Sequence, residues 1–369
     1  NNVFYSNNNS LGGDYSVEST GNNNITNNTP TIILLTNQTY STLFNTDGIY
    51  SYTGDGDTLA LASNLYGVDL IFNNTSINMV NTGNYTIYNG TIKFLSTDKI
   101  YSSFIGININ NVNKSAIITD FENNVINSLT FTNASITVTG ENITAIISDS
   151  QTQYRSTYLI FHDMNFTMKG TNVTLLHFIG IKLPTSFSGS LRMVNTTIDI
   201  NAEDTARLFD IQNCSAAFIQ NNLTIKGKNV IIINSDLGVF SDGLRYNNII
   251  GEGDNVILLD YRNDLTGYTV QIRYNNITLS SNNPIHAINV INSTKIQLSN
   301  NTILINATNN GIPIITVTNG TNNQVTNNYI QAHDVAGNDA VEQTGIIINN
   351  NQPADGNYRV IINKNIPEN

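Results

Sequence analysis

Hydrophobic and polar residues alternate along most of this chain with a period of two. Ile296 and Leu298, and then Ile303 and Ile305, alternate with polar residues. Isoleucine, valine, threonine and tyrosine, which favour strands, fill these segments, and no apolar stripe with the 3.6-residue period of a helix continues beyond two turns. The pattern predicts short β-strands that turn one face toward a core and the other toward solvent.

A motif of two asparagines followed by an apolar residue recurs at a nearly constant spacing. The copies are Asn221-Asn222-Leu223-Thr224-Ile225, Asn247-Asn248-Ile249-Ile250, Asn275-Asn276-Ile277, Asn300-Asn301-Thr302-Ile303 and Asn327-Asn328-Tyr329-Ile330. From one second asparagine to the next, the steps are 26, 28, 25 and 27 residues, which is the range of solenoid repeats. Three short strands and three turns use about one such period, so we predict an all-β, right-handed parallel β-helix with one period per coil.

The second asparagine of each copy is predicted to turn inward at one corner of the coil. A side-chain amide both donates and accepts hydrogen bonds, and asparagine tolerates left-handed turns, so stacked copies can satisfy buried turn backbone. We favour this structural role over a binding stripe. The predicted ladder consists of Asn222, Asn248, Asn276, Asn301 and Asn328.

The chain divides into three predicted regions. Residues 1–30 are polar and lack apolar periodicity, which predicts an N-terminal arm. Residues 31–95 are expected to form the capping first coils, because an open solenoid end exposes strand edges and an apolar cross-section. Residues 96–369 form the regular coils, so that 31–369 is one continuous solenoid domain. Protruding turns are predicted at 183–190 and 349–356, and loops on a rigid scaffold are common recognition sites.

Composition narrows the functional classes. The chain has 65 asparagines, only 12% charged residues and a net charge of −11, without the clusters of Lys and Arg that nucleic-acid binding requires. The 40% hydrophobic content predicts a folded core.

Cys214 is the only cysteine, so it is expected to be a buried side chain rather than part of a disulfide. We expect no membrane span and no signal peptide, and therefore a mature or excised piece of a longer protein.

A polar residue at one strand end recurs from coil to coil, and four arginines lie close to it in the sequence. Aligned copies give the series His177, Asp210, Asn234, Asp260, Asn289 and Thr316, with Arg207, Arg245, Arg262 and Arg273 as basic neighbours. Asp210 and Asp260 are two coils apart, about 9–10 Å, a separation that suits an inverting pair of carboxylates. No pectinase-type motif and no dense aspartate cluster accompanies them, so we favour a solvent-facing polar row, or weak contacts to a glycan or ion, and expect no metal or cofactor.

Tyrosines near coil exteriors are the predicted binding anchors, because their rings offer large contact areas at low entropic cost. We expect a shallow recognition surface at residues 260–274, in which Tyr261, Tyr268 and Tyr274 are joined by Asp210 and Asp260. Each contact is expected to be weak and to become useful through multivalent display. Further tyrosines of this kind are Tyr246 and Tyr329.

Asn-x-Ser/Thr sequons are frequent, as expected by chance in a chain so rich in asparagine and threonine. They are compatible with a surface location without proving it. At the predicted inward positions Asn222 and Asn276, a glycan is not expected in the folded state.

The run Asn37-Gln38-Thr39-Tyr40-Ser41-Thr42-Leu43-Phe44 with Gly48, followed by Gly56-Asp57-Thr58-Leu59-Ala60-Leu61, resembles the head of asparagine- and threonine-rich adhesin-like surface proteins of methanogenic archaea. The coils from Asn195 to Ile330 resemble their β-helical body, so the resemblance covers about residues 31–369. Such coils also occur in autotransporter passengers, pectin-degrading enzymes and phage tailspikes.

The resemblance implies an extracellular, cell-surface protein that contacts a glycan or a surface protein of another cell, with its anchor outside this chain. We expect no catalysis. The alternative is a carbohydrate-active β-helix enzyme, a polysaccharide lyase or glycoside hydrolase that acts on an acidic polysaccharide through Asp210, Asp260 and Arg262.

Overall fold

The structure is a computed structural model of the 369-residue chain. It describes residues 32–51, 57–97, 100–121, 127–149, 157–180, 189–236, 239–262, 269–291, 295–308, 314–318, 324–333, 347–349, 352–353 and 360–362. The predicted N-terminal arm lies outside the described residues, as do most of the turns predicted at 183–190 and 349–356.

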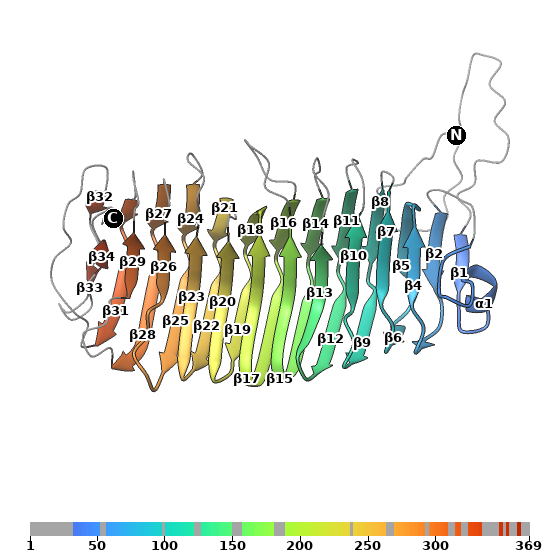
Figure 1. Cartoon of the computed structure of the whole chain (residues 1–369), viewed down its shortest axis with the longest axis horizontal. Helices are drawn as coiled ribbons and strands as arrows, with labels where there is room; N and C mark the ends of the chain where they lie inside the picture. The colour runs from blue at the N-terminus through green and yellow to red at the C-terminus, as the bar shows by residue number, and fades with distance from the viewer. Residues whose placement is uncertain are drawn as a thin grey trace, which may run out of the picture.

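Short strands stack side by side along one long axis, and the chain returns to the same faces in every coil (Figure 1). We call the first row of strands face A. Its members, in spatial order, are β1 (Ile32–Leu35), β2 (Asp57–Leu61), β5 (Ile77–Asn81), β8 (Tyr101–Ile105), β11 (Asn127–Thr132), β14 (Thr157–His162), β16 (Gly189–Val194), β18 (Cys214–Ile219), β21 (Val239–Arg245), β24 (Thr269–Arg273), β27 (Lys295–Ser299), β30 (Gln324–Thr326) and β32 (Ile347–Asn349).

Two further rows complete each coil. Face B contains β3 (Leu65–Tyr66), β6 (Thr86–Tyr88), β9 (Asn108–Val112), β12 (Ser135–Gly140), the first parts of β15 (Asn165–Ile179) and β17 (Thr197–Gln212), β19 (Asn222–Lys226), β22 (Asn248–Gly253), β25 (Asn276–Ser281), β28 (Thr302–Thr308), β31 (Tyr329–His333) and β33 (Gln352–Pro353). Face C contains β4 (Leu70–Asn73), β7 (Ile92–Ser96), β10 (Ile117–Phe121), β13 (Ile143–Asp149), the second parts of β15 and β17, β20 (Asn229–Asp236), β23 (Asn255–Arg262), β26 (Ile288–Ile291), β29 (Ile315–Thr318) and β34 (Val360–Ile362).

Every one of these named strand pairs is parallel, which confirms the predicted all-β parallel β-helix. The coil length varies more than the predicted 25–28 residues. Asp57 pairs with Ile77, a step of 77 − 57 = 20, whereas Val173 pairs with Ala206, a step of 206 − 173 = 33. Strand pairing fixes the coil spacing at about 4.8 Å, so the turns take up the differences in length.

The core is a continuous column of inward side chains from all three faces. Phenylalanines stack from coil to coil inside it, as with Phe104 and Phe131, whose ring centroids are 4.6 Å apart. Phe131 in turn stacks on Phe161 at 5.4 Å. Such aromatic pairs contribute about 0.5–1.5 kcal/mol each beyond the area that they bury.

The asparagine ladder exists, but three of its five predicted members are wrong by one residue. The buried ladder consists of Asn221, Asn247, Asn275, Asn301 and Asn328. Predicted members Asn301 and Asn328 are therefore confirmed. Asn222, Asn248 and Asn276 are instead exposed first residues of strands on face B, so the sequons at Asn222 and Asn276 face solvent.

The error arises from the residue in the left-handed turn before the ladder. Asn300 and Asn327 occupy this turn in the last two copies, with φ of 56°. In the earlier copies the turn residue is Gln220, Tyr246 or Tyr274, so the ladder residue is the first asparagine of the pair. In every copy an apolar residue lies two positions after the buried asparagine, so aligning the copies on that apolar residue identifies the ladder correctly.

Each ladder amide bonds both along the stack and to a strand. The Asn247 Nδ2 group donates to Asn275 Oδ1 and to the Phe218 carbonyl, both at 2.9 Å. Its Oδ1 accepts from the backbone N–H and from the Nδ2 group of Asn221, also at 2.9 Å. Buried turn groups are thus satisfied by side chains, which explains why asparagine recurs at this corner.

A short helix, α1 (Tyr40–Leu43), lies at the N-terminal end of the described solenoid (Figure 1). Leu43, Phe44 and Tyr50 of this segment are buried, and the Phe44 ring packs against Phe72 at a centroid distance of 5.9 Å. The segment therefore covers the apolar end of the core.

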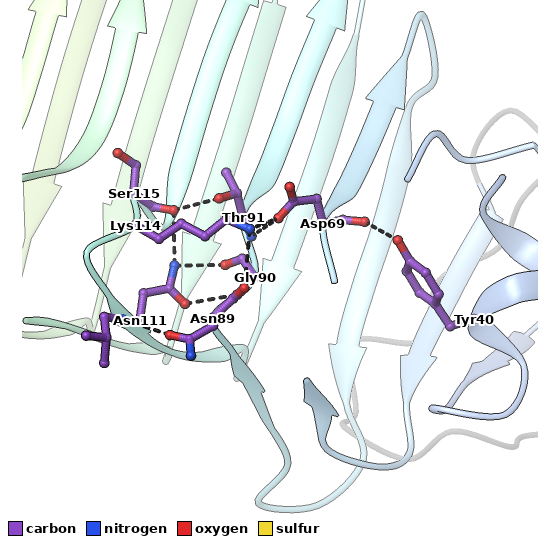
Figure 2. Close-up of polar contacts among 9 residues, drawn as sticks. Tyr40, Asp69, Asn89, Gly90, Thr91, Asn111, Lys114 and Ser115 are labelled. Carbon is purple, nitrogen blue, oxygen red and sulfur yellow. Dashed lines mark hydrogen bonds and ion pairs between the residues drawn. The ribbon is translucent and has the colours of Figure 1, made fainter. Parts of the chain in front are cut away.

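Polar contacts fasten this segment to the first coils (Figure 2). The Tyr40 hydroxyl donates to the Asp69 carbonyl at 2.6 Å, and the Asp69 carboxylate accepts from the Thr91 N–H at 2.9 Å. Lys114 reaches the same carboxylate from a later coil. Asn111 is buried beside them and both accepts from the Gly90 N–H and donates to its carbonyl. This cluster joins the helical segment to face B and face C.

Candidate functional site

The polar series predicted from the sequence forms one continuous row on face C. His177 pairs with Asp210, Asp210 with Asn234, and Asn234 with Asp260. The row then continues through Asn289 to Thr316. The predicted alignment is confirmed. The period-two alternation is interrupted at the same place in neighbouring strands, where two consecutive residues such as Ile232 and Ile233 or Leu258 and Leu259 are buried, so the register is kept from coil to coil.

Asp210 is the most heavily bonded carboxylate of this row. It accepts a hydrogen bond from Asn234 Nδ2 at 2.7 Å and contacts His177 Nδ1 at 2.9 Å. Arg207 Nη1 lies 3.7 Å from the same carboxylate. Its bond to His177, followed by that to Asn234 and the charge of Arg207, lowers the pKa of Asp210 despite partial burial. The group is therefore an acceptor and not a proton donor at neutral pH.

Asp260 forms a second, smaller group. Asn289 Nδ2 donates to its carboxylate at 2.9 Å, and Arg262 Nη2 lies 3.9 Å away. His286 stands beside it, with Nε2 2.9 Å from Thr316 Oγ1. Burial lowers the pKa of His286, and the nearby Asp260 charge opposes this effect. The sequence alignment did not find His286, because it lies outside the strand and not in the aligned row.

The two aspartates of the row are separated by Asn234, and thus by two coil spacings of about 4.8 Å. Each carboxylate is held by an amide of the neighbouring coil, and each has an arginine of its own strand within 4 Å. The arrangement presents alternating acceptors and donors on an open sheet face.

Of the tyrosines predicted to form a recognition surface at 260–274, one is buried and one is exposed. Tyr261 is fully buried, because it follows the outward Asp260 on a strand and therefore points inward beside Ser235 and Val290. The alternation along the strand was therefore sufficient to predict that Tyr261 points inward. Tyr268 lies outside the described residues, whereas Tyr274 is exposed, as predicted.

Tyr274 belongs to an exposed aromatic stack at the corner between faces A and B. Its ring lies parallel to that of Tyr246 on the preceding coil, with centroids 5.1 Å apart and an interplanar angle of 6°. The two side chains are 42% and 56% exposed, respectively. The Arg273 guanidinium carbon lies 5.5 Å from the Tyr274 ring centroid. Tyr329, two coils further on, is also exposed.

The left-handed turn positions these rings. Tyr246 and Tyr274 have φ of 59° and 58°, a conformation that costs free energy for residues other than glycine. Ring stacking and the buried asparagine that follows each tyrosine hold this turn in place. The sequence signal was the repeated segment Arg-Tyr-Asn-Asn-Ile, which starts at Arg245 and again at Arg273. Arg245 and Arg273 are paired on β21 and β24.

Two surface hollows were not anticipated from the sequence. One, of about 330 Å³, lies beside Gly106 at the corner between faces A and B. The other is a more open groove of about 610 Å³ at the corner between faces B and C, where Gly227 and Gly253 lack side chains. An ion pair of 2.6 Å between Lys226 and Glu252 crosses this groove.

Two kinds of feature are absent from the described part of the chain. There, no group of three or more His, Cys, Asp and Glu side chains gathers in a way that could hold a metal ion. None of the helices in that part is long and apolar enough to cross a membrane.

Searches for related proteins gave no further guide to the site. Neither the protein-family models, nor the curated proteins, nor the solved structures yielded a match.

Proposed function

We propose that this chain is an extracellular, adhesin-like β-solenoid that binds a glycan or a protein on the surface of another cell and performs no catalysis. The observation that carries the proposal is the exposed Tyr246–Tyr274 stack, with Arg273 beside it. Tyrosine rings combine a large apolar contact area with a polar hydroxyl, a combination enriched at recognition surfaces.

Preorganisation supports this assignment. The backbone N–H groups of Asn247 and Asn275, directly after the two tyrosines, donate to the buried side-chain amides of Asn275 and Asn301, so the rings lie on a rigid corner. A ligand that binds there orders few additional side chains, which lowers the entropic cost of association. An Arg guanidinium adds hydrogen-bond donors for a hydroxyl, carbonyl or carboxylate.

The test is adhesion by a variant without the stack. Replacement of Tyr246 and Tyr274 by alanine is expected to reduce retention of the chain on glycan arrays and on intact cells by at least about tenfold, since anchor residues typically contribute 2 kcal/mol or more. Full retention by this double variant would refute the assignment.

The chain contains a matched control. Tyr66 and Tyr88 form another stack with the same centroid distance of 5.1 Å and the same interplanar angle of 6°. They lie on the strands of face B instead of the turn corner. The double alanine variant at these positions is expected to bind like the wild type, which separates a specific loss from a general effect of removing tyrosines.

The second candidate function is cleavage of an acidic polysaccharide. It is favoured by one observation: Asp210 and Asp260 share a row at two coil spacings, with Arg262 3.9 Å from Asp260. The lowered pKa of Asp210 argues against it as a general acid, so Asp260 would have to supply the proton. New reducing or unsaturated ends from polyuronate with the wild type, absent with D260N, would establish this activity.

A further inference from the structure

The hollow beside Gly106 has the features of a small binding site. The turn corner between faces A and B has a left-handed residue in successive coils, such as Asn133 and Asn195. At Gly106, with φ of 69°, the same position has no side chain. A hollow of about 330 Å³ lies beside it, bordered by Gly83, Asn84 and Asn133 among others.

The lining of this hollow is uncharged and rich in amides. Five asparagines border it, together with Ser135, and one of them, Asn81, already donates to the Tyr85 and Gly106 carbonyls at 2.8 and 2.9 Å. The other four are Asn84, Asn108, Asn133 and Asn165. Asn108 uses its Nδ2 group for a bond of 3.3 Å to the Tyr85 carbonyl. Within the described residues, the side-chain amides of the other three asparagines have no hydrogen-bond partner. Three amides therefore offer unused donors and acceptors to one space.

Equivalent side chains in later coils are already engaged. At the same turn position, Asn195 Nδ2 donates to Asp163, and Tyr246 stacks on Tyr274. The larger groove between faces B and C contains the Lys226–Glu252 ion pair, so its charged groups have partners. The hollow at Gly106 is thus a partly open depression whose exposed amides, Asn84, Asn133 and Asn165, have unoccupied hydrogen-bonding capacity.

The chemistry of the lining defines the class of ligand. An amide donates through nitrogen and accepts through oxygen, which matches hydroxyl groups, since these also do both. No Lys, Arg or His borders the hollow, so an anionic sugar would lose solvation without gaining a counter-charge. The volume is at the lower end of the range of about 300–1,000 Å³ for small-ligand sites.

We infer that this hollow binds one or two units of a neutral saccharide through Asn84, Asn133 and Asn165. The inference rests on the proposed function, because it names the ligand class for one site of a surface-binding protein. It is independent of the tyrosine stack, which lies several coils away.

The test uses two variants of the hollow and one matched control. In G106N, asparagine adopts the left-handed turn that it already has at Asn133, and its Cβ would have no atom closer than 3.5 Å. Its side chain would occupy part of the hollow. N165A removes one lining amide. N222A changes an exposed asparagine at the equivalent position of face B, two coils away and outside the hollow.

The probes are neutral hexose and N-acetylhexosamine oligosaccharides, with uronate oligosaccharides as the charged comparison. The protein is produced without N-glycans, because Asn84, Asn133 and Asn165 are sequons. We expect the wild type to bind a neutral oligosaccharide, N165A to bind it about 3–10-fold more weakly, and N222A to bind it equally well. G106N is expected to weaken binding by more than about tenfold, with an unchanged circular dichroism spectrum.

Binding of uronates alone, or equal binding by the wild type and all three variants, would overturn the inference while the proposed function stands. A wild type that binds no glycan and no cell surface would overturn both.

Discussion

Replacement of a buried ladder asparagine is expected to destabilise the solenoid strongly, whereas the same change one residue later is not. Asn247 and Asn248 are neighbours in the chain, and only Asn247 is buried. Substitution by leucine keeps a similar side-chain size at both positions and removes the amide. N247L and N248L therefore change the composition identically, so a difference in stability between them reports the loss of the ladder amide.

The magnitude follows from the groups that N247L would leave without partners. Asn221 would lose the acceptor for its backbone N–H and for one hydrogen of its Nδ2 group. Its second Nδ2 hydrogen keeps its bond to the Met193 carbonyl at 3.1 Å. Two buried donors without partners cost about 1–3 kcal/mol each, so the expected loss is about 2–6 kcal/mol. N248L is expected to change stability by about 0.5 kcal/mol or less.

Urea unfolding followed by far-ultraviolet circular dichroism measures this difference. Because solenoid stability is a sum over neighbouring coils, protease susceptibility near residues 221–275 reports local opening in the same samples. Equal midpoints and equal protease susceptibility for N247L and N248L would refute the ladder's role in stability.

Three further predictions test other parts of the structure. The pKa of Asp210 is lowered in the folded state, so its contribution to stability is present above the unfolded-state pKa of about 3.9 and is lost as the pH falls through the folded-state pKa. The difference in unfolding free energy between wild type and D210N should therefore shrink between pH 6 and pH 2. A constant difference would contradict this. Burial raises the pKa of the Cys214 thiol well above its usual range, so a thiol reagent at pH 8 should modify it only after denaturation, and rapid labelling of the folded chain would contradict its placement. Y40F removes the hydroxyl bond of 2.6 Å to the Asp69 carbonyl and should cost about 0.5–1.5 kcal/mol in urea unfolding, whereas Y66F, at an exposed tyrosine, should cost less.

Much of the fold was predictable because it depends on local alternation. The two-residue period defines which side chains point inward, and the row from His177 to Thr316 follows from aligning those strands. The ladder was displaced in three coils because a tyrosine or glutamine, and not an asparagine, occupies the preceding turn. Two consecutive asparagines do not show which of them turns inward. The apolar residue that follows does show it, because the buried asparagine lies two positions before it.

The binding features were harder to predict because they depend on the contact between coils. Tyr261 is buried through the same alternation that places Asp260 outside, so its being a tyrosine was a misleading guide to exposure. The Tyr246–Tyr274 stack requires two copies of one turn in register. The hollow at Gly106 is lined by residues of several coils that come together only in the folded chain, so no single segment of the sequence contains a signal for it.

The most direct test of a recognition function without catalysis is to recover a bound glycan after prolonged contact with the chain. The wild-type chain would be incubated with the glycan it retains most strongly on an array, and the bound and free material would be analysed by mass spectrometry. Our account predicts that the glycan is recovered at its original mass, and that the Y246A/Y274A variant retains at least about tenfold less of it. Shortened or unsaturated products, or undiminished retention by that variant, would contradict it.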